Sequence, residues 1–550
     1  MIRARSARLL AGIVAMGFVI GSAPANAAQR GSYQRISGEG SSWAAGAIDA
    51  MRVNVKQFGI TVDYNPSGSS AGRKNFLNGT VDFAASDIPF QFRPEDGSAP
   101  ENPARGSYAY IPVTAGGTAF MYNLKINGQR VTNLRLSGEN VAKIFTGAIT
   151  SWNDPALKAD NPGLTLPARK IVPVVRSDGS GSSAQFTRWM ISQHKGVWDS
   201  YCSRSGRAPA CGFTSFYPTV AGMIAQSGDL GVAGYVAQSF AEGAIGYVNY
   251  SYALGARFPV AKVLNAAGYY TEPTPENVSV SLLKAGINTN EGSDEYLTQQ
   301  LDGVYRDTDR RNYQLSSYSY FILPTKVGGQ FNEAKGKTLG AFAYYAMCQA
   351  QQQSASLGYS PLPINLVQAS FDQIRKIPGV VVQDISIAQC KNPTFSADGT
   401  NVLARNAPQP PECDKRGTTQ CATGTGGVKS VATPTAGSVA APSGQTAGGA
   451  SDGLAGGSTG DGDPTRADGG ATTGVTVCDP DTGVCAARSA GDGGLAATGG
   501  VEGMVTTTLL AGSSGWSQAQ TLMLVVFGLT LLLVFAPAVA WRHLSRRDPK

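Results

Sequence analysis

Short apolar runs alternate with amphipathic stretches between residues 33 and 390. Runs rich in β-branched and aromatic residues predict buried strands, and the stretches between them have the spacing of helices. Alternation of this kind predicts an α/β fold with mostly parallel strands, and the length suggests two lobes with a ligand at the carboxyl ends of the strands. The predicted strands are 60–64, 81–85, 108–113, 118–122, 171–175, 244–248 and 318–323, and the predicted helices are 73–78, 137–145, 182–190 and 337–349.

Both ends of the chain carry apolar runs that predict membrane targeting. Residues 1–27 combine three early arginines, an apolar run and the small residues Ala25 and Ala27, which is typical of an export signal with its cleavage site. Residues 521–541 form an apolar run long enough to span a bilayer. The basic tail 542–550 predicts that this end is cytoplasmic. We therefore expect an extracytoplasmic body with a single-pass anchor in the cell membrane.

Residues 393–520 have a different composition from the rest of the chain. They are rich in Gly, Ala, Thr, Ser, Pro and Asp and poor in aromatic residues. Such a segment buries too little apolar surface to offset the entropy of ordering, so it is predicted to be a flexible linker. Within it, residues 495–499 resemble a sortase-type sorting signal, although the apolar run begins well downstream of them.

The charge of the chain is concentrated at its ends. There are 45 Lys and Arg against 38 Asp and Glu, a formal net charge of +7, and only 2 His. The export signal holds three arginines and the tail has a net charge of +3, which leaves +1 for the body. So dilute a charge argues against a nucleic-acid partner, which needs clustered Lys and Arg. The scarcity of His argues against a metal site, and we expect no metal and no cofactor.

All 8 cysteines lie beyond the export signal. An even number of cysteines in an exported protein predicts disulfides, but the sequence alone does not prove their connectivity. We expect neighbouring cysteines to pair. The expected pairs are Cys202–Cys211, Cys348–Cys390, Cys413–Cys421 and Cys478–Cys485.

Four turns rich in Gly and Ser recur where a predicted strand meets a predicted helix. Gly allows close backbone approach, Ser supplies a hydroxyl, and a helix N-terminus supplies free N–H groups, so such turns favour anion binding. Each turn alone is better explained as helix capping. Together with Arg176, whose planar fork suits a tetrahedral oxyanion, they favour an anion site. The turns are 37–43, 66–72, 84–87 and 175–182.

These turns resemble those of the substrate-binding proteins of bacterial phosphate-specific (Pst) ABC transporters. The resemblance extends over nearly all of residues 35–380 and includes 80–87, 176–182 and 243–248. It implies the type II periplasmic-binding-protein (Venus-flytrap) fold, which closes on one phosphate. The implied binding domain is 28–392, with lobe 1 at about 33–115 and 253–392 and lobe 2 at about 116–252. The resemblance also implies high-affinity phosphate binding and delivery to ABC permease subunits, and no enzymatic activity.

The resemblance assigns roles to particular residues. Ser42, Trp43 and Ser182 stand where the family usually has Thr, Phe and Thr, so a hydroxyl or an aromatic ring is kept at each position. Asp178 matches the family residue that holds the arginine. The implied phosphate-binding residues are Ser42, Trp43 through its backbone N–H, Ser69, Asp87, Arg176, Ser180, Gly181 and Ser182.

Asp87 is the most informative of these residues. A carboxylate repels a dianion unless the ligand offers it a proton. Phosphate carries a proton at neutral pH, whereas sulfate does not. A sulfate complex would leave a buried acceptor unpaired beside like charge, at ~1–3 kcal/mol or more. The alternative role for Asp87 is that of an ordinary turn-capping residue.

A secreted hydrolase and a stalked adhesion protein remain as alternatives. Residues 68–72 satisfy the G-x-S-x-G pattern of a hydrolase elbow, but a triad needs a His. His543 falls in the cytoplasmic tail, and His194 is expected to be exposed. A phosphatase-like enzyme would need metal ligands, and no P-loop pattern occurs. The linker and anchor suit an adhesion protein. That interpretation gives no role to Arg176 and the four Gly/Ser turns.

Overall fold

The computed structural model describes residues 33–207, 211–396 and 398–434, together with the backbone of 476–478 and 485–487. The predicted export signal, membrane span and basic tail lie outside these residues. Across the part of the chain that is described, no helix is long and apolar enough to cross a membrane. The chain divides into two units, residues 1–443 and residues 444–550.

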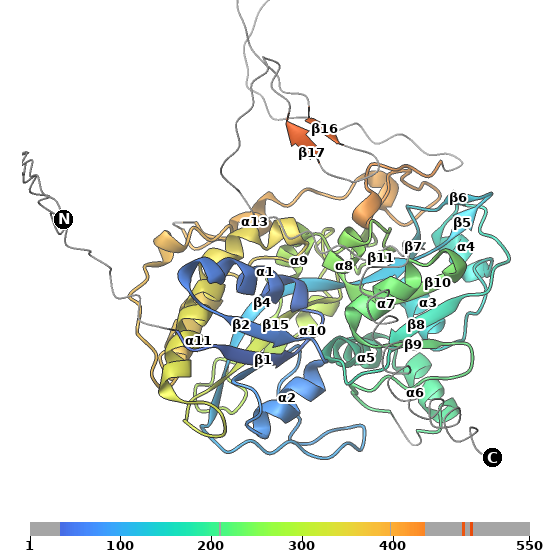
Figure 1. The fold of residues 1–550 in the computed structure, drawn as a ribbon. Helices are drawn as coiled ribbons and strands as arrows, with labels where there is room; N and C mark the ends of the chain where they lie inside the picture. The colour runs from blue at the N-terminus through green and yellow to red at the C-terminus, as the bar shows by residue number, and fades with distance from the viewer. Residues whose placement is uncertain (1–32, 208–210, 397, 435–475, 479–484, 488–550) are drawn as a thin grey trace, which may run out of the picture. The chain divides into compact units, whose positions relative to one another are not determined.

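The first unit is built on one eight-stranded sheet that runs through two lobes. The two lobes lie side by side in Figure 1, one holding β1 and β2 and the other holding β8 and β9. Strands β1, β2 and β3 are parallel, as are β8, β9 and β10, whereas β4 and β15 run antiparallel to their neighbours. The sheet is therefore mixed rather than mostly parallel. Its order is β2 (Val62–Asn65), β1 (Ile36–Gly40), β3 (Phe83–Ser86), β15 (Ser316–Pro324), β4 (Tyr108–Tyr122), β10 (Ala244–Asn249), β8 (Val172–Arg176) and β9 (Ile224–Gln226).

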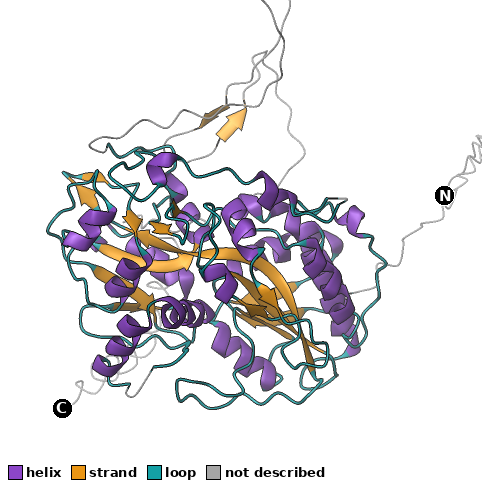
Figure 2. Cartoon of the chain, turned by 180° about the vertical axis from the view of Figure 1, so that it is seen from behind, coloured by secondary structure: helices purple, strands orange, loops and turns teal. Residues whose placement is uncertain are grey.

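The long strand β4 joins the two lobes. Its first part pairs with β15 and its last part pairs with β10. Figure 2 shows this strand crossing the molecule from behind. The sequence predicts two strands here, interrupted before residue 118, but the chain stays extended and buried throughout. Glycine is needed at the crossing because a Cβ on Gly117 would lie 2.3 Å from Pro273 Cβ.

Helices flank both halves of the sheet, and every predicted helix is present with shifted ends. Three small sheets complete the unit: β12–β11–β7, β13–β14 and β5–β6. The helices are α1 (Ala45–Asn54), α2 (Ser69–Leu77), α3 (Gly138–Phe145), α4 (Pro155–Asp160), α5 (Gly181–Gln193), α6 (Lys195–Arg204), α7 (Gly228–Val236), α8 (Tyr250–Gly255), α9 (Pro275–Leu282), α10 (Asp302–Tyr305), α11 (Glu333–Met347), α12 (Ile364–Ile374) and α13 (Val402–Asn406). The short strands are β5 (Lys125–Ile126), β6 (Gln129–Arg130), β7 (Arg135–Leu136), β11 (Lys262–Leu264), β12 (Tyr270–Thr271), β13 (Gly286–Ile287) and β14 (Gln299–Gln300).

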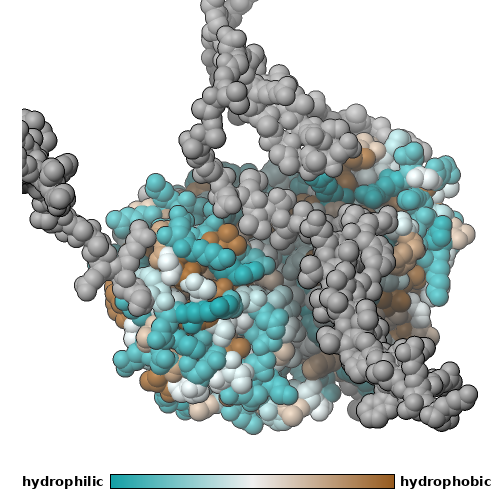
Figure 3. Space-filling view, in the orientation of Figure 1, coloured by the Kyte–Doolittle hydropathy of each residue, from teal (hydrophilic) through white to brown (hydrophobic). Residues whose placement is uncertain are grey.

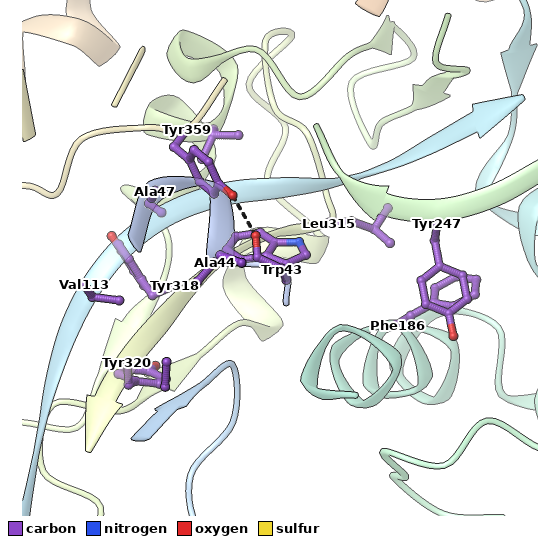
Figure 4. Close-up of a cluster of buried hydrophobic side chains, with 14 of the residues drawn as sticks. Trp43, Ala44, Ala47, Val113, Phe186, Tyr247, Leu315, Tyr318, Tyr320 and Tyr359 are labelled. Carbon is purple, nitrogen blue, oxygen red and sulfur yellow. Dashed lines mark hydrogen bonds between the residues drawn. The ribbon is translucent and has the colours of Figure 1, made fainter. Parts of the chain in front are cut away.

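The core is rich in aromatic side chains, and its largest cluster extends through both lobes. Figure 4 shows Trp43 beside Tyr359, whose hydroxyl donates to the Trp43 carbonyl at 2.8 Å. On the other side of the same view Phe186 packs against Tyr247, with ring centroids 5.1 Å apart. The described surface in Figure 3 is mainly hydrophilic, with scattered hydrophobic residues. These large side chains bury enough apolar area to fix the strands that carry the site.

Three of the four expected disulfides are present: Cys202–Cys211, Cys348–Cys390 and Cys413–Cys421. In the second unit, β16 (Thr476–Cys478) and β17 (Cys485–Ala487) pair antiparallel, with the backbone of Cys478 opposite that of Cys485. The fourth pairing stays a prediction.

Residues 398–434, which we call the C-terminal strap, are structured, whereas the sequence predicts a flexible linker from residue 393. Helix α13 packs on α9, where Ala404 and Ala407 form an apolar cluster with Val280. The guanidinium of Arg311 donates to the carbonyls of both alanines, at 3.0 and 3.1 Å. The linker prediction is therefore wrong for this segment.

The rest of the strap lies along β7 and β11. Asp414 forms a buried ion pair with Lys262 Nζ at 2.5 Å. Arg135 Nη1 donates to the Cys413 carbonyl at 3.1 Å, and the Thr425 backbone N–H donates to the Thr132 carbonyl at 3.0 Å. Hydrogen bonds and one buried ion pair thus hold a segment whose composition offers little apolar surface to bury.

Candidate functional site

The four Gly/Ser turns follow the carboxyl ends of β1, β2, β3 and β8. The first three strands are parallel neighbours, so their turns meet at one edge of the sheet. The Gly68 backbone N–H donates to the Gly40 carbonyl at 2.8 Å, and the Ser41 N–H donates to the Ala85 carbonyl at 2.8 Å. These bonds join the first three turns into one surface in the lobe that contains β1.

The fourth turn faces this surface from the other lobe. The Ser70 N–H donates to the Gly179 carbonyl at 2.9 Å, which joins the start of α2 to the turn before α5. At Gly181, the first residue of α5, an added Cβ would lie 2.5 Å from Ser69 Oγ and 2.7 Å from Asp87 Oδ2. Only glycine allows the N-terminus of α5 to approach the opposite lobe so closely. All four predicted turns therefore converge on one place.

Asp87 is buried at the centre of this place. Its carboxylate accepts hydrogen bonds from Ser41 Oγ at 2.6 Å and from Ser69 Oγ at 3.3 Å. Burial raises the pKa of Asp87 to about 6, although the hydrogen bond from Ser41 opposes the shift. Ser41 was not expected to act here. The carboxyl thus lies where the N-terminus of α5 approaches the first three turns.

Arg176 lies at the end of β8 and is held by two carboxylates. Its Nε donates to Asp178 Oδ1 at 2.8 Å, and its Nη2 donates to Asp178 Oδ2. On the other side, its Nη1 donates to Asp229 Oδ2 at 2.5 Å and to Ser182 Oγ at 3.2 Å. Burial would lower the pKa of the guanidinium, but the charges of Asp229 and Asp178 raise it. Asp178 therefore contacts Arg176 through both of its carboxylate oxygens, and the Arg176 side chain stays cationic.

The remaining predicted residues are also buried around the same place. Ser180 caps α5 by accepting the Ser183 N–H at 3.2 Å, and its Oγ lies 2.8 Å from Ser182 Oγ. Ser42 Oγ donates to Asp229 Oδ2 at 2.7 Å. The Trp43 ring packs in the core, and its Nε1 donates to Thr118 Oγ1 at 3.2 Å.

Asp229 is a site residue that sequence reasoning missed. It lies in the first turn of α7 and is fully buried, at 0% exposure. Its Oδ1 accepts the Asn249 N–H at 2.8 Å, while its Oδ2 receives Arg176 and Ser42. Burial raises the pKa of the Asp229 carboxyl, and the charge of Arg176 opposes the shift. The available signal was the run of Ser, Gly and Asp at 227–229, which follows β9 as a fifth turn between a strand and a helix.

The loop 89–107 bridges the lobes beside this site. Glu95 forms an ion pair with Arg188 at 3.2 Å and accepts the Phe213 N–H at 3.0 Å. Asp96 Oδ2 accepts the Thr214 hydroxyl at 2.6 Å. Because the turns on both sides are buried and the loop joins the lobes, the structure corresponds to a closed form.

The hydrolase alternative gains no support from this geometry. Ser70 is the serine at the central position of the G-x-S-x-G pattern. It accepts a hydrogen bond from Arg73 Nη2 at 3.4 Å. His194 lies at the junction of α5 and α6, where its ring packs on Trp189 with centroids 4.8 Å apart. It is half-buried rather than exposed, and burial lowers its pKa. Within the described ranges, no group of three or more His, Cys, Asp or Glu is arranged to hold a metal ion.

The fold and the enclosed polar site define a two-lobed substrate-binding protein. Residues 23–350 match the family model described as a PBP superfamily domain, and the chain belongs to that superfamily. The phosphate-binding protein PstS 2 of Mycobacterium tuberculosis is 32% identical over 313 residues, which cover 56% of this chain and 76% of the relative. The phosphate-binding protein PstS of Haemophilus influenzae is 30% identical over 318 residues, or 58% of this chain and 85% of the relative. The chain is therefore a member of the family of PstS phosphate-binding proteins.

Solved structures are similar as well. A phosphate-binding protein from Stenotrophomonas maltophilia has a TM-score of 0.44 at 20% identity and covers 61% of this chain and 92% of its own. A high-affinity periplasmic phosphate-binding protein (PfluDING) bound with phosphate has a TM-score of 0.47 at 17% identity, with 64% of this chain and all of its own chain covered.

Proposed function

We propose that this protein binds inorganic phosphate between its two lobes, outside the cytoplasmic membrane, and delivers it to an ABC permease for uptake. One observation carries the proposal: four Gly/Ser turns, two helix N-termini and one guanidinium converge on a buried carboxyl. The turns and helix N-termini supply neutral donors, and Arg176 supplies one oriented charge. Membership in a family of transport substrate-binding proteins, rather than of enzymes, supports the same function.

The ligand contacts follow from the groups that point into the site. Donors come from the backbone N–H of Trp43 and Gly181 and from Arg176, and the hydroxyls of the turns complete the set. Asp87 accepts a proton from the ligand. The proposed phosphate-binding residues are Ser42, Trp43, Ser69, Asp87, Arg176, Ser180, Gly181 and Ser182, with Asp178 as a positioning residue.

Asp87 also supports the choice of phosphate over sulfate. Its carboxylate is buried and already accepts two serine hydroxyls. A bound sulfate would place unprotonated oxygens against it, so like charges would meet without solvent between them. Phosphate relieves this repulsion because one of its oxygens carries a proton. The site therefore discriminates by the ligand's proton rather than by its shape.

The proposal includes the location of the protein. The export signal 1–27, the span 521–541 and the basic tail 542–550 are the sequence features that support an extracytoplasmic binding unit with a single membrane anchor. Protease accessibility on spheroplasts or protoplasts, whose cytoplasmic membrane is intact and exposed, tests this arrangement. Protection of the binding unit, with exposure only after lysis, would contradict it.

Calorimetry on the full chain in detergent tests the binding function. We expect phosphate to bind with high affinity, sulfate to bind at least a hundredfold more weakly, and Arg176→Ala to lose most phosphate affinity. Arg375→Ala, which removes an exposed arginine directly after α12, is the matched control and should bind like the parent. Equal affinity for phosphate and sulfate would refute the role of Asp87. A phosphate affinity unchanged by Arg176→Ala would show that the site is elsewhere.

A further inference from the structure

The C-terminal strap crosses the same gap that the chain crosses between the two lobes. We call the lobe that holds β1 the β1 lobe and the lobe that holds β8 the β8 lobe. The chain passes from the β8 lobe to the β1 lobe between β12 and α9, because β12 belongs to the sheet β12–β11–β7 and α9 packs on β15. The strap contacts both sides of this crossing, since α13 packs on α9 and later residues lie along β7 and β11.

The attachment to the β1 lobe is made by α13. Ala404 and Ala407 pack against Val280 on α9. Ser279 Oγ, also on α9, donates to Asn401 Oδ1 at 3.2 Å. Asn401 caps α13, because the same oxygen accepts the Ala404 N–H at 3.1 Å. Helix α13 is thus held on α9 by an apolar contact and at its N-terminal cap.

The attachment to the β8 lobe is made by residues 412–434. The sheet β12–β11–β7 belongs to this lobe because the Ala261 N–H, just before β11, donates to the Phe120 carbonyl at 2.9 Å, in the part of β4 that pairs with β10. Asn133 Nδ2, just before β7, donates to the Cys421 carbonyl at 2.7 Å. This bond and the buried ion pair on β11 fix the second part of the strap to the β8 lobe.

A short connector, Pro408-Gln409-Pro410-Pro411, joins the two attachments. Proline fixes its own φ and restricts the residue before it, so this sequence favours the extended polyproline II conformation. The backbone has this conformation at both ends, with φ and ψ of −56° and 129° at Ala407 and of −67° and 153° at Pro411. Such a segment is a semi-rigid spacer with a rise of ~3.1 Å per residue, so the connector spans ~12 Å.

Both ends of the connector are held. At its start, Ala407 is the C-cap of α13, and its carbonyl accepts a hydrogen bond from Arg311 Nη1 at 3.1 Å. Shortly after its end, Cys413 forms a disulfide with Cys421, which closes a loop on the β8 lobe. The strap lies outside residues 23–350, which match the superfamily model, so membership in the superfamily assigns it no role.

We propose that the strap is a brace that limits how far the two lobes separate. Opening the cleft rotates one lobe against the other, which changes the distance between α13 and the loop closed by Cys413 and Cys421. The connector cannot lengthen to follow this rotation, so opening has to break hydrogen bonds at one of its ends. The open form is therefore disfavoured relative to the closed form, and a bound ligand is released more slowly. The effect on phosphate release rests on the proposed function, whereas the limit on opening does not.

The stiffness of the connector can be removed without changing its length. A triple variant, Pro408→Gly with Pro410→Gly and Pro411→Gly, keeps every side chain that attaches the strap and makes the connector flexible. The matched control is Gln409→Ala, which changes an exposed side chain of the same connector and keeps its prolines. A second variant inserts Gly-Gly-Ser after Gln409 and so lengthens the connector; it decides the question if the triple variant does not fold.

Distances between spin labels on the two lobes measure the limit on opening without any ligand. The labels are attached at Asn78→Cys, directly after α2 in the β1 lobe, and at Ala225→Cys, on β9 in the β8 lobe, both of which are exposed positions. For the full chain in detergent without phosphate, we expect longer and broader distances in the triple variant than in the parent, and unchanged distances in Gln409→Ala. Equal distances in the parent, the triple variant and the lengthened variant would overturn the inference.

Stopped-flow release of phosphate measures the consequence for the bound ligand. We expect phosphate to leave the triple variant several-fold faster than it leaves the parent, with an affinity that is weaker by a similar factor. A parent that binds no phosphate would refute the proposed function, and the spin-label distances would still decide whether the strap limits opening. Longer distances together with an unchanged release rate would refute the effect of the brace on release.

Discussion

Replacing Gly181 by alanine probes the contact on which lobe closure depends. Gly181 begins α5 in one lobe, and Ser69 and Asp87 belong to the other. A Cβ at this position would lie 2.5 Å from Ser69 Oγ and 2.7 Å from Asp87 Oδ2, whereas ordinary contacts begin near 3.4 Å. The lobes of the variant would have to stay about 0.9 Å farther apart at this point.

The expected cost follows from this overlap. Overpacking a close interface costs ~1–3 kcal/mol, which corresponds to a phosphate affinity about 5- to 150-fold weaker. We expect the ligand-free form to escape the clash, because lobes that move apart no longer hold Gly181 against Ser69. Its stability should be unchanged or slightly higher, since alanine is a better helix former than glycine by ~0.5–1 kcal/mol.

Calorimetry with phosphate and urea unfolding of the ligand-free protein measure the two effects. The control is Gly196→Ala, because Gly196 lies near the start of α6 and an added Cβ there would meet nothing within 4 Å. We expect the control to bind phosphate like the parent. If Gly181→Ala also binds like the parent, the two lobes do not meet at this contact in the phosphate complex, and the reasoning is wrong.

Three other perturbations test separate parts of the structure. Burial raises the pKa of Asp87 to about 6, so its carboxyl contributes stability below pH ~4 that is lost as the pH rises through 6. In urea unfolding of the ligand-free protein, a loss of about 3 kcal/mol over this range would mark a protein that stays closed, and a smaller loss would mark one whose lobes open and hydrate Asp87; Asp87→Asn should abolish that part of the slope. Asp96→Ala removes the acceptor for the Thr214 hydroxyl across the lobes, so stopped-flow release of phosphate should be several-fold faster; an unchanged rate would show that this bond is absent in the complex. Asp414→Ala leaves the buried Lys262 without its partner and should lower the free energy of unfolding by ~3–5 kcal/mol, whereas a loss below 1 kcal/mol would mean that the strap is not held there.

The turns were predictable from sequence because each is a local pattern. Glycine and serine between an apolar strand and a helix indicate an anion site without any knowledge of the other lobe. The family resemblance then supplied residues such as Ser69 and Asp87. What local pattern could not supply was their mutual contact, since Gly181 meets Ser69 only through the closure of two lobes. The mixed sheet escaped prediction for the same reason: the direction of β15 is set by its distant neighbours β3 and β4.

The strap and Asp229 show where compositional reasoning fails. The strap has little apolar surface, and composition alone assigns it to a linker. Its stability comes from specific bonds, such as those from Arg135 to the Cys413 carbonyl and from Thr425 to Val260, which no average over a window detects. Asp229 follows a strand of only three residues, so its turn did not stand out as a junction. In both cases the information lies in tertiary contacts, which the local sequence does not show.

The charge of the site explains how an anion can bind in a chain whose body is almost neutral. Arg176 is the cation at the centre, and Asp178 and Asp229 already compensate it. Attraction between net charges therefore does not drive binding. In the proposed site, neutral donors in the turns and at the starts of α1 and α5 hold the ligand, and Asp87 accepts the proton that phosphate carries and sulfate lacks. Because neutral donors hold the ligand, the proposed site distinguishes phosphate from sulfate by the proton that phosphate carries. A site with a surplus of positive charge would bind sulfate equally well.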